Sequence, residues 1–302
     1  MKRKQPFFSI IIPTYNRPEQ LTICLQSLVC LDYPRSRFEV IVVDDGSSTP
    51  LENIVGPFCD KFQVILLKQR HAGPAAARNT GAAQAKGEFF AFTDDDCIPA
   101  PNWLQALAAR FATFPGHAIG GRTLNALPHN LYSTASQVII EAVYAYYNVH
   151  PSPMRFFATN NLALPADRFH AIGGFDATFL TSEDRELCNR WMYHGYPLTY
   201  ASEALVYHAH MLTFSTFWWQ HFNYGRGAFH FHRARARLHQ EPMKLEPKSF
   251  YLNMLRYPFL HRQGRVAWLL TALVVMSQGA SAAGFFWEKA LQAIKKKEEK
   301  SS

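Results

Sequence analysis

The sequence predicts an α/β fold, with a mostly parallel open sheet that is flanked by helices. Two patterns support this prediction. The first is a series of short, continuous apolar runs, which are typical of parallel strands covered on both faces. The second is the helical spacing of apolar residues between these runs, which indicates βαβ units. The chain has 302 residues and 48% hydrophobic content, enough for a well-buried core.

Strands and helices are expected to alternate over the first third of the chain. The predicted strands are 7–13, 38–48, 61–69 and 88–96. The predicted helices are 17–31, 73–87 and 100–114. In the first of these helices Leu21, Leu25 and Leu28 recur at helical spacing, and a proline stands near its start.

The excess positive charge lies near the end of the chain. Of 31 basic and 23 acidic residues, 13 basic and 5 acidic ones follow from Arg233 onward, so residues 1–232 are balanced. A balanced body offers no basic groove, which argues against nucleic-acid binding. The uncharged run 266–287 reaches roughly 33 Å as a helix, about the thickness of a bilayer core. The tail therefore favours contact with an anionic membrane surface, and a buried core helix is the alternative.

The cysteine pattern indicates a reducing compartment. The five cysteines are scattered, odd in number and never spaced as CxxC. This pattern predicts neither a disulfide framework nor a zinc site.

Polar or aromatic residues follow three of the predicted strands, namely Pro13-Thr14-Tyr15-Asn16, Asp44-Asp45-Gly46-Ser47 and Asp94-Asp95-Asp96. Open parallel sheets bind ligands beyond the carboxyl ends of their strands. Three adjacent carboxylates repel one another unless a cation or solvent relieves them. Mg²⁺ and Mn²⁺ prefer such oxygen ligands, and phosphate and water complete their shells. The sequence therefore predicts a metal–phosphate site, with a solvated acidic turn as the alternative.

Five motifs occur in this order, and the resemblance that they carry covers roughly residues 7–225: SIIIPTYNRPEQL, VIVVDDGSS, HAGPAAARNTGAAQAKGEFFAFTDDDCIPAPNWL, TNNLALPADRFHAIGGFD and TSEDRELCNRWMYHGY. Together they closely resemble the family 2 glycosyltransferases of the GT-A fold. The resemblance implies an inverting transfer of a sugar from a nucleotide-diphosphate donor, with Mn²⁺ or Mg²⁺ as cofactor. It divides the chain into a nucleotide-sugar-binding half (1–125), an acceptor-binding and catalytic half of the same domain (126–213) and a membrane-associated tail (214–302).

The resemblance also implies roles on the donor side of the site. The residues that it assigns to the donor nucleotide are Pro13, Thr14, Tyr15, Asp45, Arg78, Asp94 and Asp95. Tyr15 is expected to stack on the base, and Arg78 to face the donor's negative charge. The metal ligands are expected to be Asp96, Asp94 and His208, of which Asp96 holds the diphosphate-bound cation.

On the acceptor side, Asp184 is the expected general base and Glu183 orients it or the acceptor. A carboxylate at a helix start also serves as a simple cap, which is the alternative reading. Asn160 and Asn161 precede a short predicted strand, and their amides suit contact with sugar hydroxyls.

The segment 214–237 is aromatic and basic, with rough helical spacing. It resembles the amphipathic segment that membrane-bound relatives place at the bilayer surface. Trp218, Trp219 and Phe222 would then insert, while Arg233, Arg235 and Arg237 would meet lipid phosphates. The acceptor is expected to be a lipid-linked or cell-surface glycan at the cytoplasmic face of the membrane.

A Gln-x-x-Arg-Trp signature of processive relatives is absent, because His221, Phe222 and Asn223 follow Gln220. Addition of a single sugar is therefore expected. Two other classes of function stay open from the residues alone. One is a sugar-phosphate nucleotidyltransferase on a similar sheet, although the N-terminal segment lacks the glycine- and basic-rich phosphate loop such enzymes carry. The other is a non-catalytic module that binds membrane surfaces.

Overall fold

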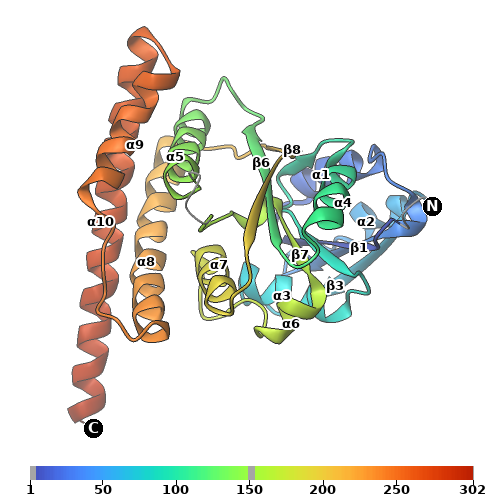
Figure 1. Cartoon of the computed structure of the whole chain (residues 1–302), viewed down its shortest axis with the longest axis horizontal. Helices are drawn as coiled ribbons and strands as arrows, with labels where there is room; N and C mark the ends of the chain where they lie inside the picture. Colours follow the sequence, from blue (N-terminus) through green and yellow to red (C-terminus); the bar gives the residue numbers. More distant parts are fainter. Residues whose placement is uncertain (1–4, 149–153, 302) are drawn as a thin grey trace.

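The computed structural model of the chain describes residues 5–148 and 154–301. One eight-stranded sheet carries helices on both faces, and three C-terminal helices stand beside it (Figure 1). The strands are β1 (Phe8–Thr14), β2 (Phe38–Asp44), β3 (Gln63–Lys68), β4 (Phe89–Phe92), β5 (Cys97–Pro99), β6 (Ala118–Asn125), β7 (Leu162–Pro165) and β8 (Leu198–His208). The helices are α1 (Pro18–Val29), α2 (Glu52–Val55), α3 (Pro74–Gln84), α4 (Trp103–Thr113), α5 (Leu131–Tyr147), α6 (Ala166–Ala171), α7 (Glu183–Tyr193), α8 (Phe214–Leu238), α9 (Lys248–His261) and α10 (Gly264–Ser301).

The strand order is β3-β2-β1-β4-β7-β6-β8-β5. Strands β1 to β4 pair in parallel, as βαβ units require. Strand β7 runs antiparallel to β4 and β6, and β5 runs antiparallel to β8. The predicted α/β sheet is confirmed, and a single sheet contains strands from both 1–125 and 126–213.

The polar residues at the ends of two predicted ranges lie outside the strands, as expected for the turn after the second strand but not for the range 88–96. The strand predicted for 38–48 ends at Asp44, and the one predicted for 88–96 ends at Phe92. A polar turn follows each of them. The backbone amide of Ser47 donates to Asp44 Oδ1 at 2.8 Å, and that of Cys97 donates to the carbonyl of Asp94 at 3.1 Å. Such local bonds compete with strand pairing, so the carboxylates after Asp44 and Phe92 lie in loops at the sheet edge.

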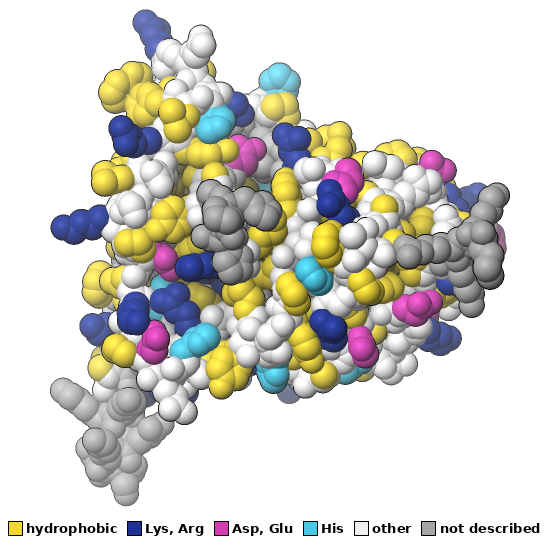
Figure 2. Space-filling model, viewed as in Figure 1, with side chains coloured by type: hydrophobic (Ala, Val, Ile, Leu, Met, Phe, Trp, Pro, Cys, Tyr) yellow, Lys and Arg dark blue, Asp and Glu magenta, His cyan; other side chains and the backbone are white. Residues whose placement is uncertain are grey.

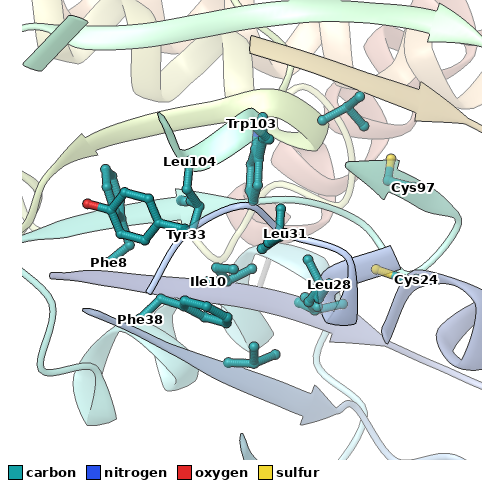
Figure 3. Packing of buried hydrophobic residues seen from close by; sticks show 14 of the residues in the cluster. Phe8, Ile10, Cys24, Leu28, Leu31, Tyr33, Phe38, Cys97, Trp103 and Leu104 are labelled. Atoms are coloured by element: carbon teal, nitrogen blue, oxygen red, sulfur yellow. The ribbon is translucent and has the colours of Figure 1, made fainter. Parts of the chain in front are cut away.

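Alternate residues of β1 pack into two cores on opposite faces of the sheet. Ile10 belongs to the core beneath α1 and α4, where Trp103 is fully buried (Figure 3). Ile11 belongs to the opposite core, together with Phe169 of α6 and Trp191 of α7. Because both faces are covered, every position of β1 is buried, which explains the continuous apolar run.

A third core joins α5 to the C-terminal helices. It contains Val138 of α5, Phe217 of α8, Met254 of α9 and Leu270 of α10. The predicted amphipathic segment is helical as expected, and Trp219 is exposed on it. Two of the predicted lipid-facing arginines of α8, however, are used inside the tail. Arg233 donates to Gln292 at 3.1 Å and Arg235 donates to the carbonyl of Lys244 at 2.7 Å.

The apolar run 266–287 lies within α10, which continues through Gly279 and Gly284. In the described part of the chain, one segment, Gly264–Lys295, is long and apolar enough to cross a membrane by length and composition, with a mean hydropathy of 1.5. This helix is also packed on one side, because Ala267, Leu270 and Val274 are buried. The predicted helix is therefore present, with one face packed against the protein and apolar residues exposed on the other.

Candidate active site

The loops after β1, β2 and β4 meet at one edge of the sheet, as the sequence predicts. Thr14 Oγ1 donates to Asp95 Oδ2 at 2.8 Å, and the backbone amide of Asp45 donates to the carbonyl of Thr14 at 2.9 Å. Strand β1 lies between β2 and β4, so the three carboxyl ends are neighbours. The polar motifs therefore form a single site.

Arg17 holds two of the aspartates, a contact that sequence reasoning missed. Its Nη1 lies 3.1 Å from Asp95 Oδ1 and 3.1 Å from Asp96 Oδ2. Burial raises the pKa of Asp95 to about 6, although the charge of Arg17 opposes this shift. The position of Arg17 after β1, next to Pro18 at the start of α1, is visible in the sequence, but its partners lie 78 and 79 residues away along the chain.

Asp96 and His208 form the pair that best fits a divalent cation. Asp96 Oδ1 lies 3.2 Å from His208 Nε2, and both side chains line the same cavity. Burial opposes ionisation of Asp96, but His208 and Arg17 hold its pKa well below the usual range. Cys97 Sγ lies within 4.8 Å of both ligand atoms, but burial raises the pKa of its thiol well above the usual value. The ionised carboxylate and the imidazole thus suit Mn²⁺ or Mg²⁺, while Cys97 stays a thiol.

Asp94 pairs with Arg78 and lies outside the group of ligand atoms around Asp96 and His208. Arg78 Nη2 is 2.6 Å from Asp94 Oδ1, and Nη1 is 2.8 Å from Glu183 Oε1. The arginine is 3% exposed, and its Nε has no partner among the described residues. Its guanidinium therefore links the aspartate triplet to the segment 181–184, which leads into α7, carries the predicted base and is called the catalytic loop below. Arg78 and Glu183 are 105 residues apart in the sequence.

Tyr15 and His71 form a stacked pair of rings at the cavity wall. Their centroids are 4.2 Å apart and their planes differ by 25°. Tyr15 is 43% exposed, which leaves a ring face for a nucleobase, as the sequence predicts. Asp45 lies behind the pair, and its carboxylate accepts from the backbone amides of Ala72 and Gly73 at 2.9 and 2.8 Å. Asp45 thereby holds the loop that carries His71, the first residue of the HAGP motif, for which the sequence predicts no role.

Glu183 and Asp184 begin α7, as the sequence predicts. Ser182 before them has φ 68°, a left-handed conformation that costs a residue other than glycine about 1–3 kcal/mol and is common at functional sites. Asp184 Oδ1 accepts from the backbone amide of Arg185 at 2.7 Å. Burial, and then the charge of Glu183, raise the pKa of Asp184 to about 7. A carboxyl group that titrates near neutral pH suits general-base chemistry.

The two predicted acceptor asparagines take different positions. Asn160 lines the cavity, and its Oδ1 accepts from Thr123 at 3.3 Å. Asn161 is 2% exposed, accepts from Trp103 Nε1 at 2.9 Å and donates to the carbonyl of Ala204 at 2.9 Å. Both amide atoms of Asn161 are used inside the protein. The structure therefore gives Asn161 a packing role in place of the predicted acceptor contact.

One cavity of about 1720 Å³ joins these groups. Its wall includes Tyr15, Asp96, Asn160 and Asp184, and it continues to side chains of α5, α8, α9 and α10. Ligand pockets usually measure about 300–1,000 Å³. The cavity therefore has room for a donor and for a second substrate beside it.

Residues 9–180 match the model of Glycosyl transferase family 2, which is more than half of the chain. The chain belongs to this family and is a glycosyltransferase that uses a nucleotide-sugar donor. Glycosyltransferase AglE of Haloferax volcanii is 30% identical over 205 residues, which cover 67% of each chain. The validoxylamine A glucosyltransferase of Streptomyces hygroscopicus is 30% identical over 229 residues, which cover 66% of this chain but only 54% of that enzyme.

Two solved structures share the fold over almost the whole chain. The mannosyltransferase PcManGT from Pyrobaculum calidifontis, in complex with GDP-Man and Mn²⁺, has a TM-score of 0.65 and 17% identity, covering 95% of this chain and 89% of that one. Staphylococcus aureus TarS in complex with UDP-GlcNAc has a TM-score of 0.58 and 18% identity, covering 95% of this chain and 92% of that one. The predicted GT-A fold and enzyme family are confirmed, and the family assignment displaces the nucleotidyltransferase and the non-catalytic module.

Proposed function

We propose that this enzyme transfers one sugar, with inversion at the anomeric carbon, from a nucleotide-diphosphate donor to a hydroxyl group of a lipid-linked or cell-surface glycan at the cytoplasmic face of a membrane. The observation that carries the proposal is the position of Asp184. It lines the same cavity as the Asp96–His208 pair, and Arg78 stands between the two groups through its pairs with Asp94 and Glu183.

On the donor side, the exposed face of Tyr15 stacks on the base, and Asp96 and His208 are the residues that would hold a divalent cation. A cation bound there stabilises the negative charge that develops on the leaving nucleoside diphosphate. Arg17, beside Asp95 and Asp96 and partly exposed, offers a second positive charge to the same phosphates. A solved relative that binds GDP-Man with Mn²⁺ supports this arrangement.

On the acceptor side, Asp184 accepts the proton of the attacking hydroxyl. The acceptor oxygen forms a bond to the anomeric carbon while the bond from that carbon to the diphosphate oxygen breaks. This single displacement inverts the anomeric centre and needs no nucleophile from the enzyme. Glu183 is held by Arg78, and its charge keeps the pKa of Asp184 high. Asn160 offers its amide to the hydroxyl groups of the sugars.

The test is an assay of the purified chain against a panel of nucleotide sugars with Mn²⁺ or Mg²⁺, read out as transfer or slow hydrolysis of the donor. Asp184→Asn should lower kcat by about 10²–10⁴-fold while donor binding, measured by calorimetry, is retained. Asp167→Asn makes the same change on an exposed position of α6 and should leave kcat unchanged. Full activity of Asp184→Asn would exclude it as the base, and failure to bind or turn over any donor would reject the proposed function.

A further inference from the structure

Helix α10 presents an apolar stripe to solvent. Exposed apolar or small residues recur every three or four positions, at Val266, Leu269, Ala272, Val275, Gly279, Ala282, Phe286, Ala290 and Ile294. At 1.5 Å per residue the stripe is about 42 Å long. Its upper end is widened by Trp268, 70% exposed, whose ring centroid lies 4.9 Å from that of Phe259 on α9. An exposed apolar surface of this extent marks an interaction site.

The charges beside the stripe are positive. The segment 248–295 carries six exposed basic residues, namely Lys248, Arg256, Arg262, Arg265, Lys289 and Lys295. None of the six forms an ion pair within the described part of the chain. The single acidic residue of this segment, Glu288, is 5% exposed. Figure 2 shows hydrophobic side chains alternating with Lys and Arg along the edge that α9 and α10 form. An apolar strip bordered by unpaired cations matches a lipid leaflet with anionic headgroups.

On the opposite face of α10, its backbone packs directly against the backbone of α8. A Cβ at Gly284 would lie 1.9 Å from the carbonyl oxygen of Phe222, and one at Gly225 would lie 1.9 Å from that of Ser281. Glu288 accepts from Arg226 of α8 at 2.8 Å. A bilayer cannot replace these contacts, since they pair a carboxylate and bury backbone polar groups.

Helix α8 is in turn joined to the catalytic loop. A Cβ at Gly227 would lie 2.2 Å from Thr181 Oγ1, and this hydroxyl donates to the carbonyl of Asn223 at 3.0 Å. Insertion of α8 and α10 across a bilayer would therefore pull the segment just before Asp184 into the hydrocarbon or break these contacts.

We infer that α10 lies in the plane of an anionic membrane leaflet, with its apolar stripe among the lipids, and does not cross the bilayer. The inference extends to the acceptor, where it rests on the proposed function. Tyr251 of α9 and Phe286 of α10 are 39% and 60% exposed and also line the cavity. When the exposed side of α9 and α10 docks on the membrane, the cavity therefore faces the lipid surface, and a lipid-linked acceptor enters from there.

The first experiment uses inside-out membrane vesicles from cells that express the full chain with a C-terminal tag. An added protease should remove the tag, and alkaline carbonate should release the protein. A tag that is protected from the protease, or a protein that stays in the carbonate pellet, would show a spanning helix and overturn the inference.

The second experiment measures sedimentation of purified protein with phosphatidylcholine vesicles, with and without phosphatidylglycerol. Binding should require phosphatidylglycerol, and the double substitution Trp268→Glu and Leu269→Glu should weaken it by about tenfold or more. The control is Ile23→Glu, which places one glutamate at a 48% exposed apolar position of α1. Thermal melting and donor binding should be unchanged in both variants.

Other outcomes overturn the inference. Equal binding of the double variant would show that the stripe is not the surface that binds lipid, and no binding of the wild type would exclude a lipid surface. A dimer in solution that the double variant disrupts, without vesicle binding, would assign the stripe to a second copy of the chain. Vesicle binding without turnover of any donor would reject the proposed function and leave the docking surface in place.

Discussion

Replacement of Arg78 by methionine tests whether the link between the aspartate triplet and the catalytic loop stabilises the fold. Arg78 is 3% exposed, and its Nη atoms lie 2.6 Å from Asp94 and 2.8 Å from Glu183. Arg78→Met leaves two largely enclosed carboxylates without their counter-charge, a change that costs about 3–5 kcal/mol. Because domains are stable by about 5–15 kcal/mol, this loss is a large part of the whole.

The comparison is Arg110→Met. Arg110 also makes a close ion pair, with its Nε 2.5 Å and its Nη2 3.0 Å from the carboxylate of Glu203. This pair is exposed, however, with 35% and 39% of the two side chains accessible. A pair screened by water contributes about 0.2–1 kcal/mol. Methionine keeps most of the apolar stem in both variants, so the difference between them reports the burial of the charges.

Urea unfolding, followed by circular dichroism near neutral pH, measures both losses. We expect the loss for Arg78→Met to exceed that for Arg110→Met by at least about 2 kcal/mol. Turnover should also fall in Arg78→Met, since Glu183 loses the group that orients it. Equal losses in the two variants, or a loss below about 1 kcal/mol for Arg78→Met, would show that water reaches the carboxylates and would refute the reasoning.

Three further predictions concern the base, the helix contact and the metal. The rate of transfer should rise with pH through about 7, as Asp184 loses its proton. Glu183→Gln should move this rise to lower pH, because it removes a charge that raises the pKa of Asp184. A pH profile of initial rates that is the same in Glu183→Gln and the wild type contradicts the assignment. Gly227→Ala should lower the Tm, because its Cβ would lie 2.2 Å from a hydroxyl of the catalytic loop, whereas Gly279→Ala, with nothing within 4 Å, should not. His208→Ala should weaken Mn²⁺-dependent donor binding by at least about tenfold in calorimetry, and unchanged affinity would remove His208 from the metal site.

The parallel half of the sheet and its ligand edge could be predicted because their signals are local. The apolar run of β1 and the polar residues directly after it lie within a few positions of each other. The parallel pairing of β1 with β2 and β4 then brings the loops after these strands together, whatever the distant parts of the chain do. The short strand predicted after Asn161 is β7, whereas β5 was missed because its three residues are too few for a periodic pattern.

The contacts that connect the site were beyond sequence reasoning, since their partners lie far apart along the chain. Arg78 and Glu183 are 105 residues apart, and Arg17 and Asp96 are 79 apart. The sequence also could not show which of Asn160 and Asn161 lines the cavity. The two residues are identical and adjacent, and the single turn Thr159–Asn161 decides which amide faces the cavity.

The contact between α8 and α10 explains why the apolar run 266–287 contains glycines. Glycines such as Gly284 weaken a helix that must span a bilayer alone, since they add little apolar surface. The same residue lets α10 approach the backbone of α8, where any Cβ would collide with Phe222. The exposed face keeps the larger side chains, including Trp268 and Phe286. Small residues on one face of α10 and large apolar side chains on the other therefore suit the inferred arrangement, in which the helix packs on α8 with one side and meets lipid with the other.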